Sequence, residues 1–454
     1  MNWVAQAPEK DHDLRMTSVD SALAARPWVP ADCEATVQAA ATRTANAEAA
    51  QRAQMIDDLI SANTTIHDVE CVNLNPASNT IGPRANAALA SGLGSRASLG
   101  YPGGKYEMGL EAIEQIEVIA AELAGEVFGA SYAEVRIPSG AIANLYAFMA
   151  CAQPGDSIIV PPATIAGHVT HHAAGAAGLY GLVAHEAPIN PDTYTIDVDA
   201  LADLAATIQP KVISVGGSLN LTHHDVAGVR RAADTVGAKV LFDAAHLSGP
   251  IAGGAWPNPL ADGAHVMTMS TYKSLSGPTA GLLVTNDAAI AERVDAIAYP
   301  GLTANFDAGN TAALAHTLND WLAYGSDYAN TMTACATQLA TCLQRRGVPI
   351  HQAGGQATLS HAFALDARQT GGGHNTALHL RQANLLTSAI GLPSGLNDGL
   401  RIGTNELVRW GATVEDMDPL AGLIARALQS DKPHDVAADV SAYRSQFTSV
   451  HYTR

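Results

Sequence analysis

Short apolar runs alternate with helical stretches through the middle of this chain, and this alternation constrains its fold more than any other feature. Runs rich in aliphatic and β-branched residues occur at 157–160, 211–215, 239–242 and 266–269. Helical sequence separates several of them, as at 226–236. Repeated strand–helix units of this kind build a mostly parallel sheet covered by helices. The sequence therefore predicts an α/β fold.

The length of 454 residues exceeds what one hydrophobic core supports, so we expect more than one domain. Polar, alanine-rich sequence broken by prolines predicts an N-terminal helical arm over residues 1–85. The strand–helix alternation predicts a large domain over 86–310, and a smaller α/β pattern predicts a C-terminal domain over 311–430. The polar residues 431–454 are expected to form a tail.

Charge and cysteine content narrow the partners and the compartment. The net charge is −18, from 25 basic and 43 acidic residues, and no cluster of lysines and arginines offers a surface for nucleic acid. The 5 cysteines are scattered without a C-x-x-C pair, which predicts a reduced, cytoplasmic protein. Neither a signal peptide nor an apolar run of membrane-spanning length is evident, so we expect no membrane partner.

A carboxylate and an amine follow two successive predicted strands. Asp243 comes directly after the run 239–242, and Lys273 lies shortly after the run 266–269. Pyridoxal phosphate needs such a pair, because a lysine holds its aldehyde as an imine and a carboxylate keeps its pyridine nitrogen protonated. Taken singly, Asp243 also suits a helix N-cap and Lys273 also suits a protein surface.

Two further segments after predicted strands offer weaker signals. Ser139, Gly140 and Ala141 precede a helix, where backbone N–H groups can hold a phosphate, although such turns are common. A histidine cluster contains His168 and His171. A stacking ring and a polar loop are both open interpretations of this cluster, whereas a metal site is disfavoured because adjacent histidines point apart on a regular element.

Arg401 lies in the segment Gly-Leu-Arg-Ile-Gly-Thr near the end of the predicted C-terminal domain. A guanidinium fork matches the α-carboxylate of an amino acid. A structural salt bridge explains a lone arginine equally well. The order of the candidate residues along the chain strengthens the functional interpretation, because ligands of open α/β sheets bind at the carboxyl ends of strands.

Together these segments resemble serine hydroxymethyltransferase and its relatives, which are pyridoxal phosphate enzymes of fold type I, the aspartate aminotransferase-like class. The resemblance runs from about residue 72 to 425 and rests on ordered motifs. Ser-Thr-Tyr-Lys-Ser-Leu-Ser-Gly-Pro at 270–278 matches the lysine segment, and Asp-Ala-Ala-His at 243–246 matches the family's Asp-x-Ala-His. Ala-Gly-His-Val-Thr-His at 166–171 and Leu-Arg-Ile-Gly-Thr at 400–404 match two more family motifs.

The resemblance implies a role for each matching residue. Lys273 would be the Schiff-base lysine, Asp243 the partner of the pyridinium nitrogen, and His168 the ring stacked on the cofactor. His246 would lie near the cofactor's phenolic oxygen and the substrate, and Arg401 would hold the substrate carboxylate. The remaining cofactor residues would be Ser139, Gly140, Ala141, Ser218 and Ser270, and the remaining substrate residues would be Ser78 and Tyr106.

Several positions depart from the family pattern. The glutamate that serves folate-dependent transfer is replaced by Leu99, which cannot move a proton, and a carboxylate reappears eight residues later at Glu107. The histidine before the lysine is replaced by Tyr272, and the family serine near residue 77 by Ala77. The pterin-binding loop before Arg401 has no counterpart. The cofactor set is therefore kept, while much of the folate set is lost.

The resemblance and these departures lead to one main hypothesis. We expect a pyridoxal phosphate-dependent aldolase or transaldolase that acts on the Cα–Cβ bond of β-hydroxy-α-amino acids without folate. Its partners would be an amino acid and an aldehyde. His171 or Glu107 would take the β-hydroxyl proton, with His246 as a further candidate and Tyr272 as a determinant of which bond breaks. No metal ligand set is expected.

Three alternatives stay open at this point. The first is true serine hydroxymethyltransferase activity with tetrahydrofolate, and the second is racemisation or β-elimination on the same cofactor. The third is a family member without catalytic activity. For any of the enzymes we expect a homodimer, or a dimer of dimers, because active sites in this superfamily lie at the dimer interface.

Overall fold

The computed structural model describes residues 21–454, which separate into two compact units at Val69 and Glu70. In the first unit, helices α1 (Ala31–Ala45) and α2 (Ala49–Thr64) follow one another, and neither buries a side chain. A reciprocal capping box between Glu48 and Gln51 starts α2. Residues 1–20 of the expected N-terminal arm lie outside the described residues, and the expected domain boundaries stay a prediction.

The second unit is built on a seven-stranded sheet in the order β4–β12–β11–β10–β9–β5–β6. Five neighbouring strands are parallel: β11 (Val266–Ser270), β10 (Lys239–Asp243), β9 (Val212–Gly216), β5 (Ser157–Val160) and β6 (Val183–Glu186). Strand β12 (Gly281–Thr285) is antiparallel to both of its neighbours, β11 and β4 (Tyr132–Glu134). The predicted α/β fold with a mostly parallel sheet is confirmed.

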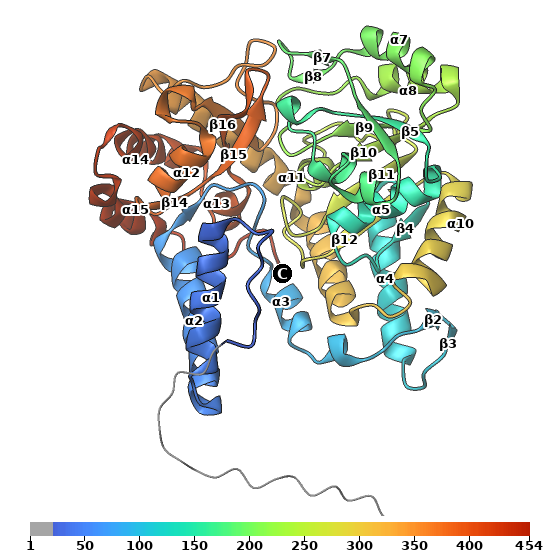
Figure 1. Cartoon of the computed structure of the whole chain (residues 1–454), viewed down its shortest axis with the longest axis horizontal. Coiled ribbons are helices and arrows are strands. Elements are labelled where there is room, and N and C mark those ends of the chain that lie inside the picture. The colour runs from blue at the N-terminus through green and yellow to red at the C-terminus, as the bar shows by residue number, and fades with distance from the viewer. Residues whose placement is uncertain (1–20) are drawn as a thin grey trace, which may run out of the picture. The chain divides into compact units, whose positions relative to one another are not determined.

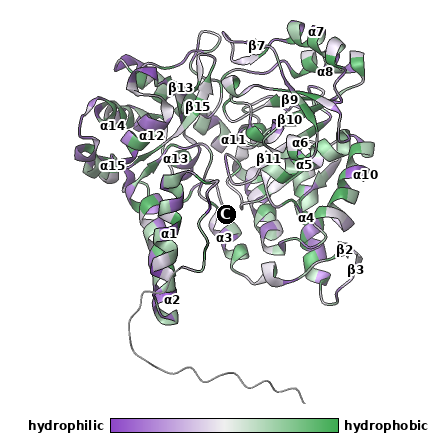
Figure 2. Cartoon of the chain, in the orientation of Figure 1, coloured by the Kyte–Doolittle hydropathy of each residue, from purple (hydrophilic) through white to green (hydrophobic). Residues whose placement is uncertain are grey.

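Helices cover both faces of this sheet because alternate strand residues point to opposite sides (Figure 1). Leu241 and Val266 pack on one face with helices α5 (Gly140–Cys151) and α10 (Ala288–Ala296). The other face packs against α4 (Glu111–Phe128), α7 (Val198–Ile208), α8 (Val226–Val236) and α11 (Ala308–Arg345). Figure 2 shows hydrophobic residues along the central strands and hydrophilic residues mixed with them on the outer helices.

The C-terminal part of the second unit carries a three-stranded antiparallel sheet in the order β13–β16–β15. Its strands are β13 (Ala362–Asp366), β15 (Ser388–Leu392) and β16 (Gly395–Gly403), and β15 and β16 are joined by a short turn. Helices α12 (Gly373–Arg381) and α14 (Met417–Gln429) pack near it, followed by α15 (Ala437–Arg444). None of the helices between residues 21 and 454 combines the length and the apolar character that crossing a bilayer requires.

A two-stranded parallel pairing joins distant parts of this unit. Strand β1 (Val72–Asn73) pairs with β14 (Leu385–Leu386), and helices α3 (Pro83–Leu89) and α13 (Asn405–Arg409) are further short elements of the unit. A small hairpin of β2 (Gly100–Tyr101) and β3 (Gly104–Lys105) lies between α3 and α4 in the chain.

Strand β4 ends at Glu134, whose carboxylate accepts from both the backbone N–H and the guanidinium of Arg136. Helix α5 begins directly after Ser139, which caps it by accepting from the N–H of Ile142. Strands β6 and β12 were not predicted.

Candidate active site

Asp243 is the centre of a buried polar cluster at the carboxyl end of β10. Its Oδ2 accepts from Asn144 at 2.9 Å and lies 2.8 Å from Nε2 of His171. Its Oδ1 accepts from the backbone N–H of Ala245. Although burial opposes ionisation, the bonds from His171 and Ala245 hold the pKa of Asp243 well below its usual range. The site therefore contains a permanent buried carboxylate.

His171 binds this carboxylate and is itself held by two further contacts. Its Nδ1 lies 3.0 Å from the hydroxyl of Ser214, and its ring packs edge-on against Phe148. With both ring nitrogens engaged and a side chain only 2% exposed, His171 has no lone pair directed at the cavity. The structure thus places this predicted base behind Asp243.

Asn144 was not identified from the sequence, yet it connects the cluster. Its Nδ2 donates to Asp243 and to the hydroxyl of Thr170, and its Oδ1 accepts from Thr268 at 2.6 Å. A lone asparagine within the apolar helix sequence of α5 was the signal that could have identified it. Buried amides of this kind are retained only when their donors and acceptors are satisfied.

Lys273 lies beyond the end of β11 in a tightly turned segment. Asn79 donates to its carbonyl oxygen, the N–H of Gly277 donates to Thr271, and Ser276 adopts a left-handed φ of 62°. Burial lowers the pKa of Lys273 to about 8, with Asp243 acting against and Arg401 in favour of this shift. At such a pKa about a tenth of the amine is neutral and nucleophilic at pH 7, far more than for an unperturbed lysine.

A cavity of about 110 Å³ brings most of the predicted residues together at the carboxyl ends of the strands. From the sequence-based set it is lined by Ser139, Gly140, Ala141, His168, Ser218, Asp243, His246, Ser270, Tyr272 and Lys273. A Cβ atom at Gly140 would lie 2.1 Å from the Ser270 hydroxyl, so a larger residue there would displace the Ser270 side chain. No three His, Cys, Asp or Glu side chains of residues 21–454 converge as metal ligands would.

Two histidines face this cavity in the neutral state. Burial is the main cause of a lowered pKa at His168. Burial also lowers the pKa of His246 well below its usual value, and the nearby charges of Lys273 and Arg401 lower it further. Nε2 of His246 lies 3.3 Å from Nη1 of Arg401, which can only donate, so the ring proton lies on Nδ1. That Nδ1 is buried and has no hydrogen-bond partner among residues 21–454.

Arg401 reaches the cavity region from β16. Its guanidinium donates to the Ser218 carbonyl oxygen at 2.5 Å and to the Ser388 hydroxyl. Burial lowers the pKa of Arg401 to about 10, so it stays protonated. Ser78, by contrast, does not line the cavity, since its hydroxyl accepts from Asn73 and its carbonyl oxygen accepts from Asn405.

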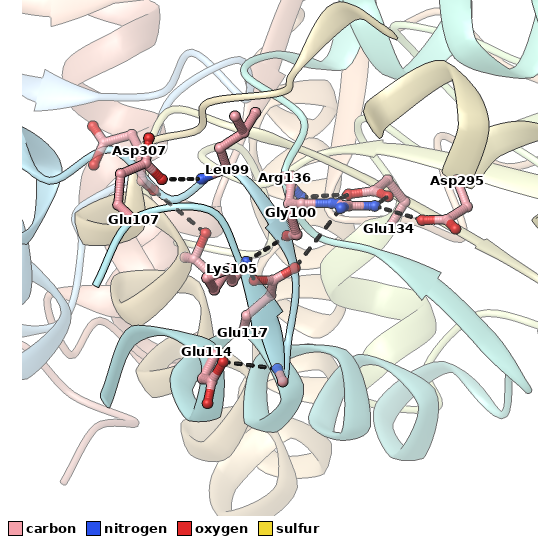
Figure 3. Close-up of polar contacts among 12 residues, drawn as sticks. Leu99, Gly100, Lys105, Glu107, Glu114, Glu117, Glu134, Arg136, Asp295 and Asp307 are labelled. Atoms are coloured by element: carbon pink, nitrogen blue, oxygen red, sulfur yellow. Dashed lines mark hydrogen bonds and ion pairs between the residues drawn. The ribbon is translucent and has the colours of Figure 1, made fainter. Parts of the chain in front are cut away.

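Glu107 and Tyr106 lie on the hairpin segment, away from the cavity of their own chain. Glu107 accepts from the backbone N–H of Leu99 at 3.2 Å (Figure 3). Tyr106 is 78% exposed. The hairpin is anchored by Lys105, whose Nζ donates to Gly100 at 2.7 Å and pairs with Glu117 at 2.6 Å.

The anchor continues into a buried ion network (Figure 3). Glu117 lies 3.8 Å from Arg136, which also pairs with Glu134 at 2.5 Å and Asp295 at 2.8 Å. The side chains of Lys105 and Glu117 are only 4% and 8% exposed. The hairpin is therefore held to α4 by a desolvated ion pair, together with an exposed hydrogen bond that the Gly103 N–H donates to Glu114.

The sequence matches the family described as serine hydroxymethyltransferase over residues 50–424. The chain belongs to the serine hydroxymethyltransferase family. The family's fold type I architecture agrees with the seven-stranded, mostly parallel sheet, and family members use pyridoxal phosphate. The chain is thus an enzyme, and the resemblance inferred from its motifs is confirmed.

Relatives within the serine hydroxymethyltransferase family differ in similarity. An "Alpha-methylserine aldolase" of Variovorax paradoxus is 57% identical over 436 residues, covering 95% of this chain and 99% of that protein. A protein of the same name from Ralstonia sp is 52% identical, covering 95% of this chain and 100% of that protein. The "Serine hydroxymethyltransferase" of Methanopyrus kandleri is 35% identical, covering 84% of this chain and 91% of that protein. The prediction that this chain is an aldolase-type member of the family is therefore confirmed.

Proposed function

We propose that this enzyme is a pyridoxal phosphate-dependent aldolase that cleaves α-methylserine to alanine and formaldehyde, or forms it from them, without folate. The observation that carries the proposal is one cavity lined by a weakly basic lysine and an ionised aspartate, with a buried arginine at its edge. The identity to the α-methylserine aldolases supports the choice of substrate.

The cavity residues fit the cofactor in three respects. The first turn of α5 presents backbone N–H groups beside Ser139 and Gly140, as a phosphate requires. Asp243 supplies a fixed carboxylate for a ring N–H. The buried N–H at Nδ1 of His246 has no partner in the part of the chain that the structure describes, so an acceptor oxygen on the ligand would satisfy it.

The mechanism follows from the state of each side chain. When bound, pyridoxal phosphate would supply an electron sink for the pair released at Cα of the substrate. Lys273 supplies a neutral amine, Asp243 holds the proton on the ring nitrogen, and Arg401 binds the carboxylate. His168 is placed to cover one face of the cavity.

The β-hydroxyl proton must be taken by a group that reaches the cavity. His171 is engaged by Asp243 and Ser214, and His246 presents an N–H rather than a lone pair. Tyr272 lines the cavity and is our proposed group within the chain, where its phenolate would take the proton and become the phenol. Glu107 would reach a cavity only if the hairpin segment that carries it came from a second copy of the chain. Such an arrangement is consistent with a homodimer.

Folate independence is supported by two departures from the family. Leu99 offers no carboxylate, and the connection between β15 and β16 is only Pro393 and Ser394. We also propose that the enzyme works as a homodimer in the cytoplasm, where its five free cysteines would stay reduced.

A direct assay tests the function. The holoenzyme is incubated with α-methylserine, threonine, allo-threonine and phenylserine, and the released aldehyde is measured with and without tetrahydrofolate. We expect formaldehyde and alanine in equal amounts from α-methylserine, unaffected by tetrahydrofolate. Absence of aldehyde from every substrate would refute an aldolase, and strong stimulation by tetrahydrofolate would favour hydroxymethyl transfer instead. The Lys273→Ala variant serves as the inactive control.

A further inference from the structure

Ser388 contacts the carboxylate-binding arginine because the two residues are directly paired across strands. In the β15–β16 ladder Ser388 lies opposite Arg401. Directly paired residues on one face of an antiparallel sheet have side chains in contact. The Ser388 hydroxyl oxygen accepts from Nε of Arg401 at 3.2 Å and from Nη2 at 3.0 Å. One hydroxyl therefore binds a whole edge of the guanidinium.

Asn75 fixes the orientation of this hydroxyl. Ser388 donates to Oδ1 of Asn75 at 3.1 Å. Asn75 lies within reach because β1 pairs with β14, with Asn73 opposite Leu386, two residues before Ser388. Its backbone N–H donates to Asn73, and its Oδ1 also accepts from the N–H of Ala77. A hydroxyl has one donor and two acceptor positions, so all three of Ser388 are used.

The other side of the guanidinium is held as well. Nη1 of Arg401 donates to the Ser218 carbonyl oxygen and lies 3.3 Å from His246. With Nε and one N–H of Nη2 bound to Ser388, and Nη1 engaged by Ser218 and His246, the second N–H of Nη2 is left for a carboxylate. An arginine held in its binding conformation loses less side-chain entropy when the ligand arrives.

We propose that Ser388, oriented by Asn75, is a positioning residue that presents Arg401 to the α-carboxylate of the substrate. This proposal rests on the function assigned above to Arg401. It predicts that Ser388 influences carboxylate binding specifically, because Ser388 itself does not line the cavity.

The test compares Ser388→Ala with the conservative Ser388→Thr in the holoenzyme. Loss of a hydrogen-bond acceptor to a charged group should raise KM for α-methylserine about tenfold in Ser388→Ala, with kcat changed less than about threefold. Threonine keeps the hydroxyl and should restore most of the loss. Ser394→Ala, an exposed serine in the turn between the same two strands, is the matched control and should match wild type.

Binding without turnover provides a second readout. Dissociation constants are measured for 2-aminoisobutyrate, which has no β-hydroxyl, and for its neutral primary amide. Ser388→Ala should weaken binding of the carboxylate and leave binding of the amide unchanged, whereas general damage to the fold would weaken both. The double variant Asn75→Ala/Ser388→Ala should bind the carboxylate about as weakly as Ser388→Ala alone, since both changes act on one relay.

The outcomes separate this proposal from the function on which it rests. If wild type is active and Arg401→Ala raises KM while Ser388→Ala does not, the positioning role is refuted and the function stands. If Arg401→Ala leaves KM unchanged, the assigned carboxylate site itself is wrong.

Discussion

Replacing Lys105 by methionine tests whether the buried ion pair beneath the hairpin stabilises the fold. Methionine keeps most of the length and apolar contact of lysine but removes its charge. Breaking a buried pair typically costs about 3–5 kcal/mol, because the remaining ion is left without its partner. Arg136 stays 3.8 Å from Glu117 and partly compensates its charge, so we expect a loss at or just below the lower end of that range, about 2–3 kcal/mol.

The pH dependence of this loss has a definite sign. Burial raises the pKa of Glu117 above 4.5, while the hydrogen bond and charge of Lys105 act to lower it. Loss of Lys105 should therefore raise the pKa of Glu117 further. A carboxyl group with a raised folded-state pKa destabilises the protein fully above that pKa, and this penalty disappears as the pH falls below the unfolded value. The deficit of Lys105→Met should therefore shrink as the pH is lowered.

Urea unfolding followed by circular dichroism at about pH 7.5 and about pH 5.5 measures both effects. The double variant Lys105→Met/Glu117→Leu removes both charges and should be less destabilised than Lys105→Met alone. A deficit below about 1 kcal/mol, or one that grows as the pH falls, would refute the argument that Glu117 is held as a desolvated ion by Lys105.

Three further predictions concern the cavity. Lys273→Ala should abolish the visible band of covalently attached cofactor and the release of formaldehyde, as measured by absorbance and aldehyde assay; full retention of the band would exclude Lys273 as the attachment site. Asp243→Asn should lower kcat by about a hundredfold or more without changing the fold, because a neutral amide cannot stabilise a protonated ring nitrogen. Steady-state kinetics measures this loss, with circular dichroism as the control for folding, and a much smaller loss would contradict the assigned role of Asp243. The rate at which apoenzyme takes up pyridoxal phosphate should rise as the pH passes through about 8, because the neutral amine of Lys273 is the nucleophile. A rate that stays constant between about pH 7 and about pH 9 would argue against the lowered pKa of Lys273.

The sequence predicted four of the five parallel strands for a physical reason, although it missed the buried antiparallel strand β12. The run 157–160 coincides with β5, and 239–242 and 266–269 each fall one residue short of their strands, since continuous aliphatic runs mark the interior of a parallel sheet. Strand β6, Val183–Glu186, contains a histidine and a glutamate at the edge of the sheet and lacks such a run. Edge strands therefore escape this kind of prediction.

The same contrast applies to the site. Asp243, Lys273 and Arg401 could be named because each lies in a local motif. Asn144, Ser214 and Ser388 could not, since their roles depend on contacts between segments that only the tertiary structure brings together. The role of His171 is a related case, because its sequence environment does not tell whether its nitrogens face the cavity or Asp243.

The pairing of β1 with β14 has a consequence for the carboxylate-binding side of the site. Residues that line the cofactor cavity fall between 139 and 273, within one continuous stretch of chain. The carboxylate-binding side needs Asn75 and Ser388, which are 313 positions apart, and Asn73 with Glu406, which are 333 apart. The orientation of the carboxylate-binding side therefore depends on the β1–β14 pairing, whereas the residues that line the cofactor cavity come from one continuous stretch of chain.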